Sequence, residues 1–542
     1  MIFFGGSMST STEIEIQKKP IKRIVLSVVF GIVFVLAVAL ISISVWYKNN
    51  YSMEFTALLE VLNGPIEGTG ANMIHDICWA VIPSSVIALV VYVAAIIVIE
   101  VLSKEHSYNF RVRIDNGDPH KISITRDTQK KYQLIRIGGS ILCSCTLLFS
   151  LIFTVFSFKM LSFFQTFGDK TTIYEDRYVD PADVAITANG ETKNIIYIYL
   201  ESMETTHASV EAGGMLDKNY IPNLTKLAIE NTNFSQHSDT SKLGGFYALA
   251  GSSWTIAGIL SSTGGIPYAF KVGNNGMDKA NSFAPLLTTF GDILEEKGYH
   301  NYFLCGSDAV FGGRESYFST HGNYTIYDLY TARADGSIPA NYHDGWWGYE
   351  DHYLYEIAKA KITEAASKDE PFNFTMLTVD THPKKGHGCK LCGGEDVTEN
   401  VLPCADTQIY NFVNWCKEQS FYEDTVIVIV GDHLRSDNSL VEELEYHDRR
   451  VYNCIINSDA VPVEGADTSR LWCTFDLFPT VLAAMNFNID GNRLGLGVNM
   501  YSGEKTLIEE MGFDEFDYEM HCSSDFYTKR WIFNIDEKKN EG

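Results

Sequence analysis

Three side chains that could bind a divalent metal ion follow two strongly apolar stretches of this chain. Residues 194–200 (NIIYIYL) are followed by Glu201, and residues 425–430 (TVIVIV) are followed, after one glycine, by Asp432 and His433. Each stretch predicts a fully buried strand, and open α/β sheets place their sites at the carboxyl ends of such strands. Carboxylates are hard donors and imidazole is a borderline one, so the set suits Mn, Mg or Zn. Asp-His alone could merely cap a helix, but the matching position of Glu201 favours a metal site.

A hydroxyl that could act as a nucleophile lies between these stretches, at Thr255 in the sequence WTIAG. A threonine hydroxyl is a poor nucleophile, but coordination to a cation lowers its pKa and orients its oxygen. The small and apolar residues that follow predict a helix whose first turn could present this oxygen to a phosphate. Thr255 could equally be the N-cap of that helix. The local sequence leaves both interpretations open.

Two further predicted strands also end in polar side chains. The strand at 301–305 precedes Ser307 and Asp308, and the strand at 372–379 precedes Asp380 and His382. Predicted helices alternate with the strands, at 221–230, 283–297, 349–366, 405–417 and 475–485. The alternation predicts an α/β domain with a mostly parallel central sheet covered on both faces, with four strand ends meeting at one edge.

Three uncharged segments lie in the first 160 residues, at 24–46, 77–99 and 137–158. Each reaches the roughly 20 residues that span a bilayer. The first is longer than the about 7–15 apolar residues of a signal peptide and has no small-x-small cleavage site after it, so we expect an uncleaved helix. The chain therefore divides into a membrane domain with three transmembrane helices (1–160), an interfacial linker (161–192) and an extracytoplasmic catalytic domain (193–542).

Basic residues predict the orientation of these spans. Four Lys and Arg residues precede the first span, the loop at 102–136 has eight, and the loop between the first two spans has only Lys48. By the positive-inside rule, the amino terminus and the second loop are cytoplasmic. Everything after about residue 159 then lies outside the inner or plasma membrane.

The predicted outer domain is strongly acidic. The first 160 residues hold 14 basic and 11 acidic residues, which leaves 42 − 14 = 28 basic and 68 − 11 = 57 acidic residues, a formal charge of −29. This charge argues against nucleic acid as a partner, because nucleic acid is bound through clustered Lys and Arg. It also disfavours docking on anionic lipid by charge alone, so a lipid substrate must be held by local groups.

Eight of the eleven cysteines lie in this outer part. Cys389, Cys392 and Cys404, with His387, could bind zinc through three thiolates and an imidazole. No second C-x-x-C is present, so a loop held by a disulfide is favoured over zinc.

Four sequence blocks, taken together, resemble one known family. They are NIIYIYLES at 194–202, WTIAGILSSTGGIP at 254–267, TVDTH at 378–382 and GDH at 431–433. In order and spacing they are similar to the lipoteichoic acid synthase and phosphoglycerol transferase I family, within the alkaline-phosphatase/sulfatase superfamily. The WTIAG and TVDTH blocks are most similar to the phosphoglycerol transferase I branch, and three spans are fewer than the five typical of lipoteichoic acid synthases.

The resemblance implies one metal ion, typically manganese, held by Glu201, Thr255, Asp432 and His433, with Thr255 as the nucleophile. Phosphatidylglycerol would be the donor, and glycerol phosphate would pass through a phospho-threonine intermediate to a cell-envelope glycan or glycerophosphate acceptor. Such a two-step route predicts ping-pong kinetics.

Two more residues match substrate-binding positions of the family. Arg314 occupies the place of a phosphate-contacting arginine, and a guanidinium matches phosphate oxygens well. His382 matches a substrate-binding histidine that could donate to phosphate or carry a proton. Each could instead be structural, Arg314 as an ion-pair partner and His382 as the end of a strand. Trp346 and Trp347 could line a glycerol pocket or pack in the core.

Other functions remain open from the sequence. A phosphoethanolamine transferase or a phosphodiesterase/sulfatase-type hydrolase of the same fold would use another donor or water. A sulfatase needs a Cys or Ser that is converted to formylglycine, and Thr255 cannot undergo this conversion. A catalytically inactive binding or sensor module would have lost ligands, whereas this chain retains all four.

Overall fold

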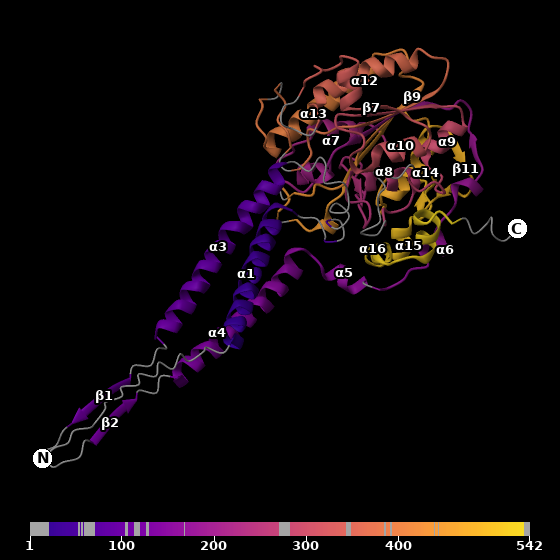
Figure 1. Cartoon of the computed structure of the whole chain (residues 1–542). Coiled ribbons are helices and arrows are strands. Elements are labelled where there is room, and N and C mark those ends of the chain that lie inside the picture. Colours follow the sequence, from indigo (N-terminus) through magenta and orange to yellow (C-terminus); the bar gives the residue numbers. More distant parts are fainter. Residues whose placement is uncertain are drawn as a thin grey trace, which may run out of the picture. The chain divides into compact units, whose positions relative to one another are not determined.

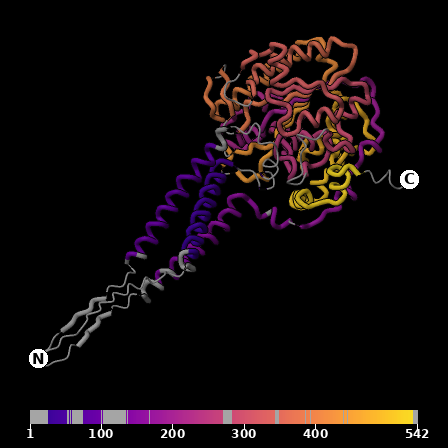
Figure 2. The backbone as a smooth tube through the Cα atoms, in the orientation of Figure 1, coloured from indigo at the N-terminus to yellow at the C-terminus, as the bar shows by residue number. Residues whose placement is uncertain are grey.

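The computed structural model describes residues 21–51, 55, 58, 71–102, 107–112, 120–125, 129–166, 168–269, 282–342, 348–383, 386–390, 393–437, 439–442 and 444–535. The chain divides into two compact units, which are described separately (Figures 1 and 2). Unit 1 comprises residues 1–46 and 74–157, and unit 2 comprises residues 47–73 and 158–542.

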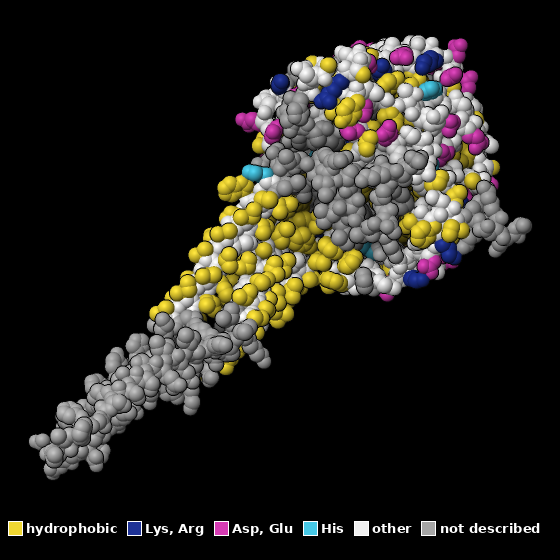
Figure 3. Space-filling model, viewed as in Figure 1, with side chains coloured by type: hydrophobic (Ala, Val, Ile, Leu, Met, Phe, Trp, Pro, Cys, Tyr) yellow, Lys and Arg dark blue, Asp and Glu magenta, His cyan; other side chains and the backbone are white. Residues whose placement is uncertain are grey.

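The long helices of unit 1 are apolar enough to cross a membrane. They are α1 (Ile21–Asn50), α3 (Ala71–Leu102) and α4 (Gln129–Ser157), with a hairpin of β1 (Ser107–Val112) and β2 (His120–Thr125) between the last two. Membrane-capable windows cover Val25–Asn50, His75–Ile99 and Ile137–Ser157, and their surface is mostly hydrophobic in Figure 3. The three predicted transmembrane helices are thus confirmed by length and composition.

Hydroxyl groups connect these helices to one another. The Tyr92 hydroxyl donates to the Ser27 carbonyl (2.6 Å), and the Ser42 hydroxyl donates to Ser84 Oγ (2.7 Å). Between helices such bonds satisfy polar groups that would otherwise face hydrocarbon, a common means of joining membrane helices.

The centre of unit 2 is a seven-stranded sheet with the order β5-β10-β9-β4-β8-β6-β7. Its strands are β4 (Asn194–Leu200), β5 (Gly245–Phe246), β6 (His300–Cys305), β7 (Thr325–Tyr327), β8 (Phe372–Leu377), β9 (Thr425–Gly431) and β10 (Val451–Ile456). The five strands from β9 to β7 are parallel, and β10 and β5 are antiparallel additions at one edge. The predicted α/β domain with a mostly parallel sheet is confirmed.

Both faces of the sheet are covered, which explains why β4 and β9 are apolar throughout. On β4, Ile195, Tyr197 and Tyr199 face one core cluster, and Ile196 and Ile198 face the other. Successive side chains of a strand point to opposite faces, so a strand between two helical layers needs apolar residues at every position. Full burial of each large side chain contributes about 1.5–3 kcal/mol.

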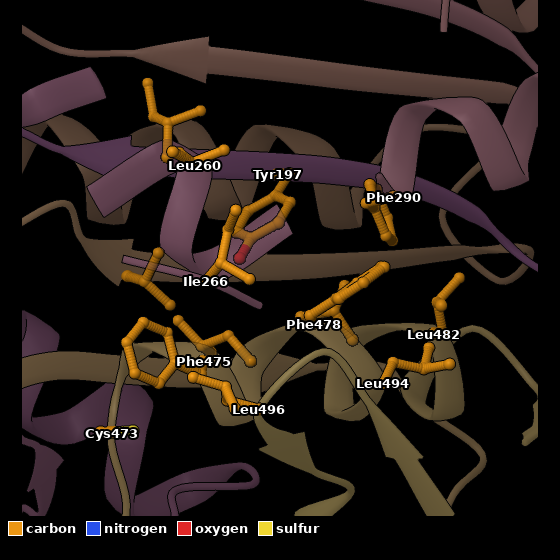
Figure 4. Packing of buried hydrophobic residues seen from close by; sticks show 14 of the residues in the cluster. Tyr197, Leu260, Ile266, Phe290, Cys473, Phe475, Phe478, Leu482, Leu494 and Leu496 are labelled. Atoms are coloured by element: carbon orange, nitrogen blue, oxygen red, sulfur yellow. The ribbon is translucent and has the colours of Figure 1, made fainter. Parts of the chain in front are cut away.

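Helices form a layer on each face. The first layer contains α8 (Thr255–Gly264), α9 (Phe290–Glu296), α10 (Arg314–Thr320) and α14 (Leu477–Ala484), and the second contains α7 (Pro222–Glu230), α12 (Asp351–Ala366) and α13 (Thr398–Lys417). Figure 4 shows the first layer, where Tyr197 of β4 lies among Leu260, Phe290 and Phe478.

Smaller elements complete unit 2. They are α5 (Leu161–Thr166), α6 (Ile173–Arg177), β3 (Ile186–Ala188), α11 (Leu329–Ala334), β11 (Phe487–Ile489), β12 (Arg493–Leu494), β13 (Gly497–Val498), α15 (Leu507–Met511), α16 (Phe513–His521) and α17 (Asp525–Tyr527). Segments far apart in sequence meet here: the Thr171 N–H donates to the Ser523 carbonyl at 3.0 Å, and the two segments run side by side in Figures 1 and 2.

Two predicted boundaries were wrong. Helix α9 begins at Phe290 and not at 283, because Thr289 and Asp292 form a capping box that starts the helix there. Helix α13 begins at Thr398, well before 405, and runs through Pro403.

Candidate active site

The two strands that deliver the predicted metal ligands are neighbours in the sheet. Strand β4 pairs with β9 in parallel, and Leu200 is opposite Gly431. The next residue on each strand, Glu201 and Asp432, therefore leaves the sheet at the same level and on the same edge. Both side chains are completely buried.

Glu201, Asp432 and His433 lie close enough to share one ion. His433 Nε2 is 3.4 Å from Glu201 Oε1 and 3.4 Å from Asp432 Oδ2. One donor atom from each residue lies within 4.8 Å of the others, and within the described parts of the chain no other group of three His, Cys, Asp or Glu side chains does so. Ligands about 2.1 Å from one cation lie roughly 3–3.6 Å apart, so the spacing fits a cation.

Neighbouring groups orient the three donors. The N–H groups of Ser202 and His433 donate to Asp432 Oδ1 at 2.8 and 2.9 Å, and the Ser202 hydroxyl donates to Glu201 Oε1 at 2.7 Å. His433 Nδ1 is 2.8 Å from the Leu434 carbonyl, which assigns the proton to Nδ1 and turns Nε2 toward the carboxylates. Asp432 Oδ2 is buried and has no hydrogen-bond partner among the described residues. A buried carboxylate oxygen without a donor fits a site for a cation.

The charges of the cluster also favour a cation. Burial, and then the charge of Glu201, raise the pKa of Asp432. Burial lowers the pKa of His433, but the charge of Asp432 and the hydrogen bond to Glu201 outweigh it and raise this pKa. Burial raises the pKa of Glu201, whereas the hydrogen bond and charge of His433 bring it below its usual range. Two buried carboxylates thus require positive charge between them.

Thr255 joins this cluster from helix α8. It is the first residue of the helix, and its hydroxyl donates to Glu201 Oε2 at 3.3 Å. Trp254, not Thr255, occupies the N-cap position, so the capping alternative was wrong. A side chain at Gly258 would overlap the carbonyl oxygen of Asp432. Only glycine therefore lets α8 approach the end of β9 closely enough to bring Thr255 to Glu201.

The structure brings together all four predicted residues, Glu201, Thr255, Asp432 and His433. Their roles as ligands and nucleophile stay predictions. Sequence reasoning missed Thr378 and Thr381, which fix Glu201 by its backbone: Thr378 Oγ1 accepts from the Glu201 N–H at 3.0 Å, and the Thr381 hydroxyl donates to its carbonyl at 2.5 Å. Both lie in the TVDTH block, so this block fixes the position of Glu201 as well as carrying His382.

His382 lies within electrostatic reach of the cluster. Burial lowers its pKa, the charge of Glu201 opposes this effect, and the charge of His433 adds to it. A largely neutral imidazole at neutral pH can accept or donate a proton. Its substrate-binding role stays a prediction.

Arg314 begins helix α10 after two glycines in the left-handed region, Gly312 and Gly313. Its buried guanidinium donates to the Phe311 carbonyl (3.0 Å), the Ser307 hydroxyl (3.0 Å) and the Asp308 carbonyl (2.6 Å). A side chain at Gly312 would lie 3.5 Å from the ring of Trp254, the residue before Thr255. The loop that carries Arg314 is therefore next to the start of α8, and its phosphate contact stays a prediction.

A buried ionic network that the sequence did not indicate supports the same sheet edge. Arg435 donates to both carboxylate oxygens of Asp437 (2.8 Å each) and to the Thr381 carbonyl (2.9 Å). Arg449 donates to both oxygens of Glu204 (2.8 and 2.5 Å) and to the Arg435 carbonyl (2.8 Å). Glu204 and Arg449 are 245 positions apart, so no local pattern could have revealed their pairing.

The remaining sequence predictions fall partly outside the described residues. Trp346, Trp347 and Cys392 are among those outside. Cys404 forms a disulfide, which removes it as a thiolate ligand and favours the disulfide alternative over zinc.

Comparisons with known proteins agree with this fold. The model of the family described as Sulfatase matches residues 193–487. "Phosphoglycerol transferase I" of Salmonella choleraesuis (strain SC-B67) is 31% identical over 338 residues, which is 60% of this chain and 41% of the relative. The protein of the same name from Xanthomonas euvesicatoria pv. vesicatoria (strain 85-10) is 30% identical over 299 residues, 54% of this chain and 40% of the relative. The matches thus span about two fifths of the length of these curated relatives.

A solved structure was also compared, that of the lipoteichoic acid synthase LtaP from Listeria monocytogenes. The two chains are 16% identical over a match that covers 59% of this chain and 79% of the LtaP chain. The TM-score is 0.44, and a similarity this weak supports no conclusion.

Proposed function

The chain belongs to the sulfatase family, and from this membership we propose that it is a membrane-anchored, metal-dependent phosphoglycerol transferase. In this proposal it moves glycerol phosphate from phosphatidylglycerol to a hydroxyl of a cell-envelope glycan or glycerophosphate acceptor. The relatives named phosphoglycerol transferase I support the choice of reaction. The observation that carries it is the 3.3 Å hydrogen bond from the Thr255 hydroxyl to Glu201 inside the ligand cluster.

One divalent ion is held by Glu201, Thr255, Asp432 and His433 in this proposal. Mn²⁺ is the preferred ion, with Mg²⁺ and Zn²⁺ as alternatives, because the set combines hard oxygens with one imidazole. The unpartnered Asp432 Oδ2 supports the assignment. When bound, the ion neutralises charge on the phosphoryl oxygens and lowers the pKa of the attacking hydroxyl.

In the first step, Thr255 Oγ1 attacks the phosphorus of the donor. An oxygen–phosphorus bond to Thr255 forms, and the bond from phosphorus to the diacylglycerol oxygen breaks. The hydroxyl proton leaves along the existing hydrogen bond toward Glu201 and passes through the neutral imidazole of His382 to the departing diacylglycerol oxygen. Because α8 begins at Thr255, the positive end of its dipole faces the phosphoryl group.

In the second step, an acceptor hydroxyl attacks the same phosphorus. The bond to Thr255 breaks, and the proton of the acceptor hydroxyl passes through His382 to the Thr255 oxygen. Arg314 binds a phosphoryl oxygen in both steps, since a guanidinium offers several donors in one plane. The separated steps give ping-pong kinetics.

The basic residues of the amino terminus and the second loop support a catalytic unit outside the cytoplasm. This is the side on which an envelope acceptor would lie.

The test uses the full chain reconstituted in lipid nanodiscs with Mn²⁺ and fluorescent phosphatidylglycerol. We expect release of diacylglycerol and a glycerophosphate-sized mass increase on the peptide that contains Thr255. Thr255→Ala should lose both, whereas Thr263→Ala, in the same helix, should keep both. Equal release by Thr255→Ala and the wild type would refute the mechanism. Turnover of phosphatidylethanolamine alone would identify a phosphoethanolamine transferase. Repeated release without an acceptor, well beyond one diacylglycerol per protein, would identify a hydrolase, and no release with intact metal binding would favour a binding module.

A further inference from the structure

Six aromatic residues of unit 2 gather where the chain continues from two membrane-capable helices. They are Tyr47, Tyr51, Phe55, Phe158, Phe163 and Phe164, here called the juxtamembrane aromatic cluster. We propose that the exposed side of this cluster, Phe164 together with Leu161, binds the headgroup layer of the bilayer, and that the cluster holds one side of the active site at that depth. The claim about the active site rests on the proposed function, whereas the claim of lipid binding does not.

The cluster joins two segments that are far apart in sequence. Tyr47 stacks on Phe158 with ring centroids 4.3 Å apart and planes at 10°, and it also lies 5.6 Å from Tyr51. Phe55 meets Phe163 edge to face at 5.2 Å. Offset or edge-to-face pairs at these distances are favourable. The described aromatic residues at and after the end of α1 therefore pack against those of the segment after α4.

Helix α5 within this surface has its apolar side outward. Leu161 is 54% exposed and Phe164 is 52% exposed, whereas the polar Thr166 is only 7% exposed. Residues three apart share a helix face, so Leu161 and Phe164 form one apolar strip. On the other side, α5 packs against α16. Two large apolar residues outside, next to the exposed polar Gln165, and a hydroxyl inside suit a helix at the membrane–water interface.

Chain continuity identifies the lipid bilayer as the partner. The apolar window of α4 ends at Ser157 and α5 begins at Leu161, a connection that can reach about 14 Å at most. Tyr47 is itself in the last turn of α1. Aromatic rings concentrate at the membrane–water interface, and the exposed Lys48 and Lys159 beside the cluster suit phosphate headgroups.

The same cluster touches the support of the active site. The backbone of Tyr51 forms an antiparallel bridge with Asp437, and the Asp437 carboxylate binds Arg435 at 2.8 Å. Arg435 closely follows His433 in the chain. Anchoring the cluster in the headgroup layer therefore fixes the depth of this edge of the site, next to the phosphate of a donor lipid.

Photo-cross-linking in the full chain tests the docking. A benzophenone amino acid is placed at Phe164 or, as the matched control, at Tyr330, an aromatic residue that is 57% exposed on α11. The chain is reconstituted in vesicles of phosphatidylglycerol and phosphatidylethanolamine, irradiated and digested. We expect a lipid adduct at position 164 and none at 330. No adduct at 164, or equal yields at both positions, would overturn the proposal.

Kinetics separate this inference from the proposed function. Leu161→Ser with Phe164→Ser should raise KM for vesicle lipid about tenfold through lost interfacial contact. It should leave kcat with a water-soluble short-chain donor unchanged. Unchanged KM on vesicles would contradict the docking role. A wild-type protein inactive on every donor would refute the proposed function alone, and the adduct at 164 would still decide the docking.

Discussion

Asp432→Asn should stabilise the metal-free protein and remove its response to metal. Asp432 Oδ1 accepts from two backbone N–H groups, and an asparagine keeps that oxygen. The new NH₂ group replaces Oδ2, which has no hydrogen-bond partner in the described structure and lies 3.4 Å from His433 Nε2. The variant thus removes a buried negative charge beside Glu201 while it keeps the hydrogen bonds that place the residue.

The expected size follows from the raised pKa. Burial and the charge of Glu201 raise the pKa of Asp432 from 3.8 to about 7, and 7 − 3.8 = 3.2 units correspond to about 4 kcal/mol. His433 loses a partner in the variant, so the net gain should be about 1–4 kcal/mol at pH 8. The pKa of Asp432 is higher in the folded wild type than in the unfolded chain. The free energy of unfolding of the wild type therefore falls as the pH rises from about 4 to 7. The advantage of the variant should therefore grow over that interval and then level off.

Thermal unfolding of the full chain in detergent, followed by tryptophan fluorescence with and without Mn²⁺, checks both parts. The metal-free variant should unfold about 2–8 °C higher than the wild type at pH 8. Mn²⁺ at a hundred times its Kd should stabilise the wild type by about 2.7 kcal/mol and the variant hardly at all. A variant that is less stable than the metal-free wild type, or one that responds equally to Mn²⁺, would refute the reasoning.

Three further changes test how the site is supported. Gly258→Ala forces a Cβ onto the carbonyl oxygen of Asp432. It should cost more than 2 kcal/mol of stability and most of the activity. Gly138→Ala, whose Cβ would meet nothing within 4 Å, should be neutral in thermal unfolding. Arg435→Lys keeps the charge but loses the paired hydrogen bonds to the buried Asp437, so kcat should fall about 10–100-fold and the Tm of the metal-free protein should also fall. Arg449→Met leaves Glu204 buried without its cation and should cost about 3–5 kcal/mol, seen as a lower Tm, unless Glu204→Gln is added. The same pair makes the protein less stable in acid. Burial raises the pKa of Glu204, but the charge of Arg449 outweighs it and lowers this pKa from 4.5 to about 2. The difference of 4.5 − 2 = 2.5 units corresponds to about 3 kcal/mol of unfolding free energy, which should be lost as the pH falls through that range.

The sequence predicts the central strands and the ligand set because both leave local signals. A strand buried on both faces must be apolar at every position, so β4 and β9 are visible as continuous runs. The residue after each run is then the first that can carry a charge, which identifies Glu201 and Asp432. Strand β10 (Val451–Ile456) is also buried throughout, but Asn453 interrupts its apolar run and no charged residue directly follows it. Its antiparallel position depends on pairing that no local pattern encodes.

What the sequence could not predict is the distance between elements. Gly258 reads as one small residue among several, and only the structure shows that it faces the carbonyl of Asp432. Ser202 has a positive φ of 52°, which turns its N–H toward Asp432 and its hydroxyl toward Glu201. The pairing of Glu204 with Arg449 joins residues that are 245 positions apart. Such contacts are properties of the tertiary fold, and a single sequence carries no sign of them.

The turn after β4 connects the site and its support into one closed chain of bonds. Glu201 contributes a carboxylate to the ligand cluster, and Glu204, in the same turn, binds Arg449 and accepts from the backbone N–H of Arg435 at 3.0 Å. Arg435 then donates to the carbonyl of Thr381, whose hydroxyl returns to the carbonyl of Glu201. Because every link in this loop is buried, a change at one member leaves a partner unsatisfied and shifts the rest. Arg435 and Glu204 should therefore affect metal affinity although neither touches the ion, as residues behind first ligands commonly do.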